Sequence, residues 1–516
     1  MPSAAPAAAT PSPLEPSASA ASGAGTATPR QRQSVLRTLR TPRWLATELL
    51  AGLVVAIALI PEAIAFSVIA GVDPRVGLFA SFTMAVTIAI VGGRPAMISA
   101  ATGAVALVIA PLVKSHGTDY FVAAVILAGL IQVVLALAGI TKLMRFIPRS
   151  VMVGFVNALA ILIFVAQVPE LIGVPWLVYP LAAAALLIVF GLPKLTTAVP
   201  APLVAIVLLT AVTIWAGWDV PTVADKGTLP DSLPGLFLPN VPLSWETLRI
   251  VAPFSLGMAL VGLMESLMTA QLVDDITDTR SNKRREAWGQ GVANVVTGFF
   301  GGMGGCAMIG QTTINVKVSG ARTRISTFVA GAALLVLVVA LGDLVGRIPM
   351  AVLVAIMIFV CWATFDWHSI RPTTLRTLPR SETAVMVVTV IATVATHNLA
   401  IGVVSGVLVA CALFARRVAG TVSVRRTDHP DGHAEYVVTG PLFFASSSQL
   451  AHRFEYASDP AEVSVDLSGA QLWDASTVAV LDDVRRRYEQ HGKRVRLTGL
   501  SGHSAQRYER LSGKLG

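Results

Sequence analysis

The chain has 516 residues, of which 54% are hydrophobic and only 13% charged, and its mean hydropathy is +0.69. This composition excludes an ordinary soluble globular protein for most of the chain. The net charge of +9 does not indicate nucleic-acid binding, because Lys and Arg are scattered between apolar segments instead of forming one basic face. The three cysteines lie in or beside apolar stretches, so neither a disulfide framework nor a cysteine metal site is expected.

The first segment, residues 1–43, is predicted to be a disordered cytosolic tail. Its first 29 residues are rich in Ala, Pro, Ser and Thr and cannot bury enough apolar surface to fold. Arginines precede the first apolar run, but no small-residue cleavage site follows it. No signal peptide is therefore expected, and the first span should remain in place.

Residues 44–417 are predicted to form a transmembrane domain. Nearly uncharged stretches recur there at roughly the 20 residues that a helix needs to cross a bilayer. The predicted spans are 44–62, 75–92, 97–113, 119–140, 149–168, 176–192, 199–217, 248–272, 286–302, 305–316, 324–342, 349–366, 382–397 and 399–415. With the N-terminus inside, about seventeen Lys and Arg residues fall in cytosolic connections and about five in outer ones. This asymmetry supports an even number of spans and two cytosolic termini.

The third and tenth predicted spans are too short and too rich in glycine and polar residues to be ordinary membrane-spanning helices. Each follows a pair of glycines, Gly92 with Gly93 or Gly301 with Gly302. Because the two segments are seven spans apart, they have opposite orientations. Paired interrupted segments indicate a transporter built from inverted repeats, here at about 44–217 and 248–415, with the substrate between them. The alternative is that small residues merely permit close helix packing.

Each broken segment is expected to begin a half-helix near the bilayer midplane, because unwound backbone in a membrane must line a cavity or be buried in protein. A helix N-terminus carries partial positive charge and unpaired amides, so two such ends facing one cavity form an anion site. The expected walls are Ser99, Ala100, Ala101, Thr102 and Gly103 on one side, and Cys306, Ala307, Met308, Ile309, Gly310, Gln311 and Thr312 on the other. Thr102, Gln311 and Thr312 can add side-chain donors.

The eighth predicted span contains Glu265 between apolar neighbours, and an intramembrane carboxylate indicates function by default. Thr269 lies four residues later on the same helix face. The pair can help to coordinate sodium, or the carboxyl group alone can carry a proton; the alternative is a protonated glutamic acid that serves packing. Glu62, beside a proline at a span end, fits an interfacial role as well as a functional one. Asn157 and Gln167 in the fifth span are expected to hold helices together.

Residues 418–516 are predicted to form a soluble α/β domain. Short β-type runs such as VSVDLSGAQLW alternate there with an amphipathic helix. Acidic and basic residues crowd this helix, among them Asp482, Asp483 and Arg485, so it cannot be another span.

Several segments together resemble the SulP sulfate permease family of anion transporters, nearest to its bacterial bicarbonate and sulfate members. They are IPEAIAFSVIAGVDPRVGLFASF, ISAATGA, MESLMTA, GGMGGCAMIGQTTINV, PLFFAS and VDLSGAQLWDAS, and the resemblance extends from about residue 44 to the end. It implies a membrane all-α fold of fourteen segments in a 7+7 inverted repeat, with core and gate domains. It also implies a C-terminal cytosolic α/β domain of the STAS type and a homodimer formed through it.

The resemblance also assigns roles to residues. Thr102 and its neighbours match the anion site of the third segment, the residues from Gly305 to Thr312 match the tenth-segment wall, and Glu265 with Thr269 matches positions linked to cation coupling. Sodium-coupled bicarbonate members have Asp where this chain has Glu265, so coupling to sodium and coupling to protons both remain open. STAS domains that act as phosphorylation switches have Ser after their signature Asp, whereas here Ala475 follows Asp474. A dimerising or docking role is therefore expected for this domain.

The sequence predicts secondary active uptake of a small inorganic oxyanion, bicarbonate or sulfate, coupled to sodium or protons by an elevator or rocking movement. Dicarboxylate symport, anion exchange, an anion channel and a membrane-bound sensor with the STAS domain as output remain alternatives. No enzymatic motif is visible, and no cofactor is expected beyond a sodium ion at Glu265 and Thr269. Thr102 is expected to take part in cation coupling together with these two residues. The expected location is the cell membrane, with the bilayer and a second copy of the chain as partners and no nucleic acid.

Overall fold

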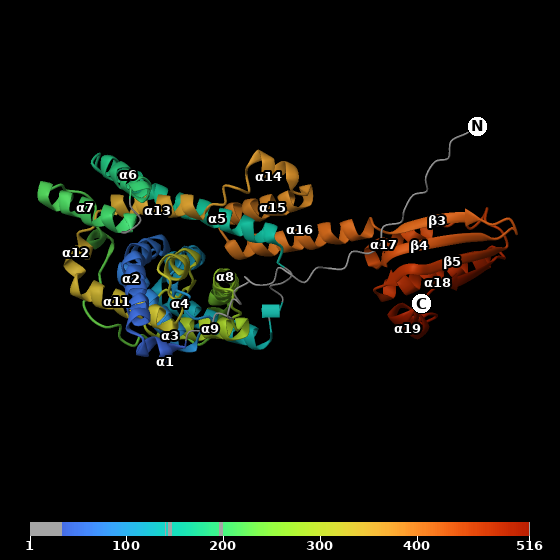
Figure 1. Ribbon diagram of the computed structural model, residues 1–516, viewed down its shortest axis with the longest axis horizontal. Coiled ribbons are helices and arrows are strands. Elements are labelled where there is room, and N and C mark those ends of the chain that lie inside the picture. The colour runs from blue at the N-terminus through green and yellow to red at the C-terminus, as the bar shows by residue number, and fades with distance from the viewer. Residues whose placement is uncertain (1–33, 140, 143–146, 196–199, 515–516) are drawn as a thin grey trace, which may run out of the picture.

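The computed structural model describes residues 34–139, 141–142, 147–195 and 200–514 (Figure 1). Most of the predicted N-terminal tail lies outside these residues. The end of that tail differs from the prediction, because Val35–Arg40 form a short helix, α1. The side chain of Ser34 caps this helix by accepting a hydrogen bond from the Arg37 amide at 3.3 Å. Helix α2 then begins at Pro42, a residue whose fixed φ suits the first turn of a helix.

The first half of the membrane domain follows the predicted order of spans, but α2 extends eight residues beyond the predicted end at residue 62, so Glu62 lies inside the helix and not at a span end. Its elements are α2 Pro42–Ala70, α3 Pro74–Val91, β1 Ser99–Ala100, α4 Gly103–Leu137, α5 Arg149–Gln167, α6 Val178–Leu195 and α7 Ala201–Ala216. Helix α4 contains both the third and the fourth predicted spans. They meet at Gly117, whose φ of 81° and ψ of −170° interrupt the helical backbone. Only glycine adopts this conformation without strain, so the kink is encoded locally.

The second half repeats this order of elements. It comprises α8 Trp245–Thr277, α9 Lys283–Phe299, β2 Cys306–Ala307, α10 Ile309–Thr313, the π-helical turn Ile314–Val318, α11 Arg324–Ala340, α13 Met350–Thr364, α15 Arg380–Thr396 and α16 Leu399–Ala419. Short helices α12 Gly342–Gly346 and α14 Pro372–Thr377 lie in connections. Among the described helices, seven are long and apolar enough to cross a membrane, and three further apolar helices are shorter. The arrangement is consistent with fourteen segments.

The membrane helices form two groups (Figure 1). In the first group, the core domain, α4 packs on α8 and α9, and α11 packs on α2 and α3. In the second, the gate domain, α5 packs on α13, α15 and α16, while α6 packs on α7 and α13. Contacts between the groups include α2 with α13 and α8 with α16. The two-domain layout implied by the family resemblance is therefore present.

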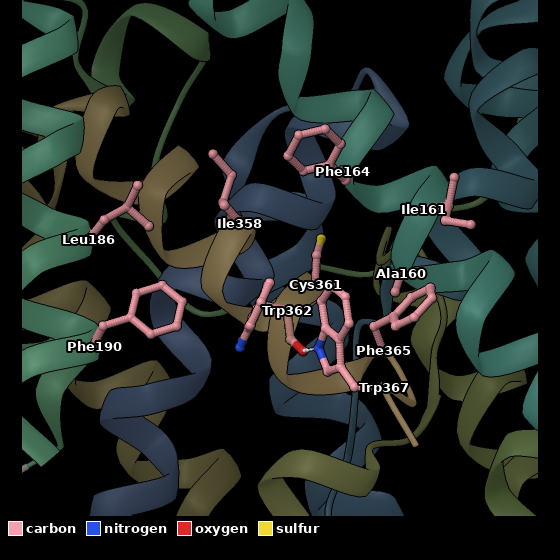
Figure 2. Close-up of a pocket in the computed structure, with 10 residues that line it drawn as sticks. All are labelled: Ala160, Ile161, Phe164, Leu186, Phe190, Ile358, Cys361, Trp362, Phe365 and Trp367. Atoms are coloured by element: carbon pink, nitrogen blue, oxygen red, sulfur yellow. Dashed lines mark hydrogen bonds between the residues drawn. The ribbon is translucent and has the colours of Figure 1, made fainter. Parts of the chain in front are cut away.

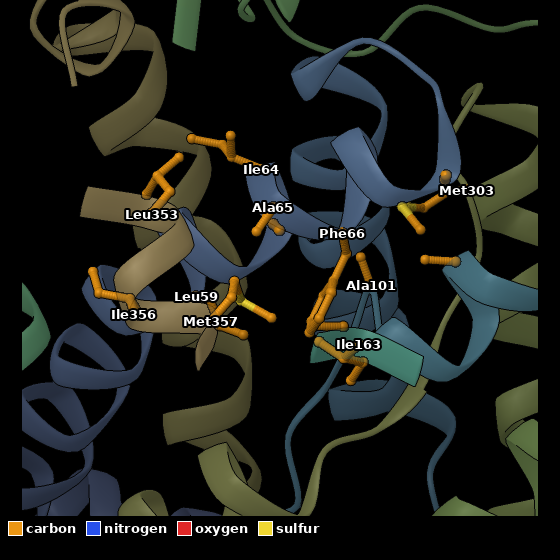
Figure 3. Packing of buried hydrophobic residues seen from close by; sticks show 14 of the residues in the cluster. Leu59, Ile64, Ala65, Phe66, Ala101, Ile163, Met303, Leu353, Ile356 and Met357 are labelled. Carbon is orange, nitrogen blue, oxygen red and sulfur yellow. The ribbon is translucent and has the colours of Figure 1, made fainter. Parts of the chain in front are cut away.

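Small residues bring core helices into close contact. Where α4 crosses α9, a Cβ atom on Gly129 would lie 2.6 Å from the carbonyl oxygen of Gly291, and one on Gly291 would lie 2.6 Å from that of Gly129. Such close backbone approach is how membrane helices associate without a hydrophobic driving force between them. The contact between core and gate is different, because large apolar side chains such as Ile64 of α2 and Leu353 of α13 belong to one buried cluster there (Figure 3).

The C-terminal part is a four-stranded sheet with helices. Strands β3 Ser423–Asp428, β4 Ala434–Leu442, β5 Glu462–Leu472 and β6 Arg494–Thr498 lie in the order β3-β4-β5-β6. The first pair is antiparallel and the other two are parallel. Helices α17 Phe444–Leu450, α18 Ala475–Gln490 and α19 Gly502–Leu511 complete the domain. The side chain of Asp474 caps α18 by accepting from the Thr477 amide at 3.0 Å.

Candidate functional site

The two broken segments meet in the core domain. Strand β1 pairs with β2 in antiparallel register, so that Ser99 lies opposite Ala307 and Ala100 opposite Cys306. The Met308 amide also donates to the carbonyl of Ile98 at 2.9 Å. The pairing satisfies backbone groups that water cannot reach inside a membrane. The sequence predicts non-helical backbone here, but not that the two segments pair with each other.

A helix begins directly after each strand. Thr102 is the N-cap of α4, and its hydroxyl accepts from the Val105 amide while its carbonyl accepts from the Ala106 amide. The N-cap of α10 is Met308, whose carbonyl accepts from the Thr312 amide at 3.1 Å. The first helical amides have no intrahelical acceptor, as at any helix start. The predicted arrangement of two half-helix N-termini in the core domain is therefore present.

The predicted wall of the tenth segment is open at one point. Gly310 is exposed, and a Cβ atom there would meet nothing within 4 Å. The corresponding start of α4 is covered instead, since a Cβ atom on Gly103 would lie 2.8 Å from Ile163 and 2.9 Å from Phe66. Ala101, Phe66 and Ile163 lie close together in the same buried cluster (Figure 3). The backbone at Gly310 is therefore accessible in this conformation, whereas Phe66 and Ile163 cover Gly103.

The predicted side-chain donors are engaged within the protein. The hydroxyl of Thr102 lies 3.2 Å from the sulfur of Cys306. That of Thr312 accepts from the Ile98 amide at 3.0 Å, and that of Ser99 accepts from Gln290 at 2.7 Å. In this structure, these hydrogen bonds connect the broken segments to each other and to α9.

Glu265 lies beside this junction. Its side chain accepts a hydrogen bond from the thiol of Cys306 at 3.0 Å, so carboxylate, thiol and the Thr102 hydroxyl form a row that links α8, β2 and α4. Thr269 donates to the Glu265 carbonyl at 2.8 Å and lies 3.4 Å from the carbonyl oxygen of Ala307. Carboxylate, hydroxyl and unwound carbonyl oxygens are ligands that suit sodium in transporters of this architecture. These oxygen atoms have the chemistry of sodium ligands, and the Glu265 carboxyl group can equally hold a proton.

Glu62, for which the sequence leaves both an interfacial and a functional role open, lies next to the start of α10. Although it follows Pro61 within α2, its carboxylate accepts from the side-chain amide of Gln311 at 2.8 Å. This contact joins α2 to the start of α10, next to the open position at Gly310. Glu62 and Gln311 therefore form a polar pair beside the accessible backbone of Gly310.

A polar stripe on α9 was not recognised in the sequence. Asn294 binds both backbone groups of Gly305, donating to its carbonyl at 3.0 Å and accepting from its amide at 2.8 Å. Gln290 binds Ser99, and Glu286 accepts from the amides of Gly93 and Arg94 at 2.7 and 2.8 Å. The signal was available, because residues 286, 290 and 294 lie four apart on one helix face.

Asn157 lies away from the junction, in the gate domain. It donates to the Ser369 hydroxyl at 2.9 Å and accepts from the Asp366 amide at 2.8 Å. These contacts tie α5 to the connection after α13, which is the helix-joining role that the sequence suggested for it.

An apolar cavity of about 540 Å³ also lies in the gate domain (Figure 2). It is lined from α5, α6 and α13 and the residues that follow α13, with Phe164, Phe190 and Trp362 among its aromatic side chains. It holds none of the predicted site residues. Its apolar lining offers nothing that would bind a small inorganic anion.

Comparison with known proteins gives a consistent result. The model of the sulfate permease family matches residues 45–178 and 174–389, and that of the STAS domain matches residues 425–512. The chain is 50% identical over 454 residues to YbaR of Bacillus subtilis, a protein named for sulfate transport, covering 88% of this chain and 94% of that one. It is 25% identical to the bicarbonate transporter BicA of Picosynechococcus, covering 90% of each chain.

Solved structures agree. The transmembrane domain of a cyanobacterial bicarbonate transporter, BicA, superimposes with a TM-score of 0.63 and 26% identity, covering 70% of this chain and 97% of that one. Murine Solute Carrier 26 family member A9, an anion transporter in the inward-facing state, gives a TM-score of 0.78 at 17% identity, covering 92% and 89%. That likeness shows the fold, including the membrane domain followed by a STAS domain. These relatives are named as transporters, which agrees with the expectation that the chain has no enzymatic activity.

Proposed function

Because the chain belongs to the sulfate permease family of multi-pass membrane anion transporters, we propose that it takes up sulfate or bicarbonate by secondary active transport. The observation that carries this proposal is the junction of β1 with β2. It places two half-helix N-termini beside the buried carboxylate of Glu265. The names of the relatives supply the two candidate anions.

The substrate-binding residues that we propose are those of the two walls. They are Ser99, Ala101, Thr102, Gly103, Ala307, Met308, Ile309, Gly310, Gln311 and Thr312. The anion first meets the exposed backbone at Gly310, where Gln311 is held by Glu62. Helix N-terminal amides stabilise the negative charge without a cationic side chain, and small neighbours let a compact anion approach them. Ile163, on α5 of the gate, leaves Gly103 as the core slides past the gate in an elevator movement, and Phe66, which travels with the core, changes rotamer to uncover the amide.

Coupling to a cation is assigned to Glu265, with Thr269 and Thr102. Either sodium binds between the carboxylate, the Thr269 hydroxyl and the Ala307 carbonyl, or the Glu265 carboxyl group takes up a proton. With either cation, its positive charge offsets the negative charge of the transported anion while the two ions are inside the membrane. An isolated charge is costly there.

The remaining parts of the proposal concern topology and assembly. The transporter lies in the cell membrane. Both chain termini face the cytosol, because Lys and Arg are in excess in the connections on that side. A second copy binds through the STAS domain. That domain does not act as a phosphorylation switch at its signature turn, because Ala475 stands after Asp474.

Transport in liposomes tests the function. The purified protein is reconstituted, and uptake of labelled sulfate, bicarbonate and fumarate is measured with an imposed sodium gradient, with a proton gradient and with neither. We expect sulfate or bicarbonate to accumulate under one gradient. Fumarate accumulation alone would instead identify a dicarboxylate symporter.

Three other outcomes distinguish the alternatives. Uptake that requires an anion on the opposite side and ignores cation gradients would identify an exchanger. Flux that never exceeds electrochemical equilibrium would identify a channel. Absence of any anion flux would contradict transport altogether and favour a sensor.

A further inference from the structure

A second cavity lies at the end of the core domain that the charge asymmetry predicts to be cytosolic. Its volume is about 760 Å³. It is lined by the start of α2, the connection from α3 to β1, the end of α8, the start of α9 and the connection into α11. All of these elements belong to the core, so the cavity does not lie on the boundary between core and gate. It is distinct from the proposed transport site.

Four arginines line this cavity, and the protein holds each of them in place. Arg285 donates to the Val91 carbonyl at 3.0 Å, and Arg324 donates to the Ala89 carbonyl at the same distance. Arg322 donates to the Ala321 carbonyl at 2.8 Å. For Arg285 and Arg324, these bonds to uncharged carbonyl oxygens fix the guanidinium group without cancelling its charge. Arg94, the fourth, pairs with Asp274 at 3.0 Å.

The carboxylates near the cavity are bound by backbone amides or by basic side chains. Glu286 accepts from the amides of Gly93 and Arg94, and Glu48 accepts from the amides of Arg322 and Thr323 at 2.7 and 2.9 Å. Neither glutamate lines the cavity. Asp274 binds Arg94 and also Lys283, at 2.9 Å. The described residues that line the cavity include four arginines and no Asp or Glu, so positive charge predominates at its wall.

The size and surroundings of the cavity indicate the ligand. A volume of about 760 Å³ is in the range of organic ligands and far exceeds a single inorganic oxyanion. Trp44 forms part of the rim, and the adjoining helix α1 exposes Leu36 and Leu39 beside Arg37 and Arg40. Tryptophan and amphipathic basic helices are typical of the membrane surface. Planar guanidinium groups bind phosphate oxygens in pairs.

We propose that this cavity binds a phosphate group of a larger molecule, either the headgroup of an anionic phospholipid or a soluble organic phosphate. The ligand lies next to both broken segments, since residues 93–96 lead into β1 and residues 320–322 follow the π-helical turn after α10. Binding there stabilises the core domain without contacting the transported anion.

Ligand-induced thermal stabilisation in detergent tests the proposal. The probes are phosphatidylglycerol and cardiolipin as lipids, phosphatidylcholine as the zwitterionic lipid control, and ATP and inorganic phosphate as soluble sources. The variants are Arg285→Gln, Arg322→Gln and the conservative Arg285→Lys. The matched control is Arg284→Gln, because Arg284 is the neighbour on α9 but reaches Leu137 and does not line the cavity.

We expect one phosphate source to stabilise the wild type and the control Arg284→Gln to the same extent. Its apparent affinity should be about tenfold weaker in Arg285→Gln and in Arg322→Gln, and largely retained in Arg285→Lys. Stabilisation by the anionic lipids would identify a headgroup site, and stabilisation by ATP a soluble ligand. If no anionic probe exceeds phosphatidylcholine, or if the Gln variants bind as the wild type does, the proposal is wrong. A response to inorganic phosphate alone, with none to the larger probes, also contradicts it.

A second measurement covers the case in which the Gln variants do not fold. Trp44→Cys is made on a Cys411→Ser background, because Cys411 is exposed whereas Cys306 and Cys361 are buried. The bound ligand should slow maleimide labelling of the new cysteine at the rim by several-fold. An unchanged labelling rate at saturating probe would overturn the assignment.

Discussion

Glu265 is the residue on which the proposed coupling depends. It is buried beside Cys306 and Thr269, so its carboxylate can bind a cation only where the broken segments meet. We expect Glu265→Gln to reduce gradient-driven uptake by about tenfold or more, because the amide keeps a hydrogen-bonding oxygen but loses the charge. Initial rates in liposomes, with and without the gradient, measure the effect.

A matched substitution elsewhere on α8 controls for loss of folding. Gln271 is exposed, and its side chain binds only Asp275 among the described residues, at 2.8 Å. Gln271→Ala should therefore transport at the wild-type rate. If Glu265→Gln accumulates the anion as fast as this control does, another carboxylate must carry the coupling.

The contact between Glu62 and Gln311 gives a second prediction at the same scale. Gln311→Ala removes the amide that joins α2 to α10 and leaves the Glu62 carboxylate without this donor next to the proposed anion path. Repulsion by that carboxylate and loss of the donor should weaken anion affinity by about tenfold. The measurement is the apparent KM for uptake. Glu62→Gln should restore part of the affinity in the double variant, and an unchanged KM in Gln311→Ala would remove Gln311 from the site.

These residues also show how far sequence reasoning reached. Glu265 stood out because a lone carboxylate in an apolar span is rare, and the structure places it at the junction. Glu62 could not be assigned, because its partner Gln311 is 249 positions away along the chain. Asp274 carries no prediction from the sequence, yet it pairs with Arg94, a residue that is only 6% exposed. Long-range pairing of polar groups is not encoded in local pattern.

At the scale of elements, the β1–β2 pair depends on glycine. A Cβ atom on Gly305 would lie 1.9 Å from the carbonyl oxygen of Ala100. We expect Gly305→Ala to force the strands apart, to destabilise the protein by about 1–3 kcal/mol and to abolish uptake. Thermal melting and transport are measured together.

Gly310→Ala separates stability from function at this junction. A Cβ atom at Gly310 meets nothing within 4 Å, so the methyl group should leave the melting temperature unchanged while obstructing the proposed anion site and slowing uptake. Gly191→Ala in α6 is the control, because it also meets nothing within 4 Å and lies outside the site. A melting temperature for Gly305→Ala equal to that of this control would contradict the packing argument. Unaltered uptake by Gly310→Ala would mean that the anion binds elsewhere.

Element boundaries were largely predictable, because apolar length and glycine position are local properties. The Gly-Gly pairs correctly marked the ends of α3 and α9 and the start of non-helical backbone. The strand pairing was not predictable, since two residues in each segment carry no periodicity. The two predicted spans within α4 meet at Gly117, where the backbone is not helical, so the predicted break between them is present.

At the scale of the whole molecule, the proposed site lies in the core domain, but the side chains that cover Gly103 come from both the core and the gate. Phe66 comes from α2 of the core, whereas Ile163 comes from α5 of the gate. Sliding of the core would therefore separate the two side chains that lie against Gly103. The STAS domain contributes no residue to the junction, and its sheet follows α16 at the end of the gate (Figure 1). Transport and assembly should thus depend on different parts of the chain.

Truncation after Gly420 tests this division. The membrane helices end at Ala419, and the STAS core is a separate cluster in which Tyr436 and Tyr488 donate to the buried Asp459. We expect the truncated protein to retain anion uptake per molecule within about twofold, because every contact at the junction remains. Its mass by detergent-corrected light scattering should fall from that of a dimer to that of a monomer. Loss of uptake in a truncated protein that still melts cooperatively would show that the STAS domain takes part in transport, and a retained dimer would place the subunit interface in the membrane.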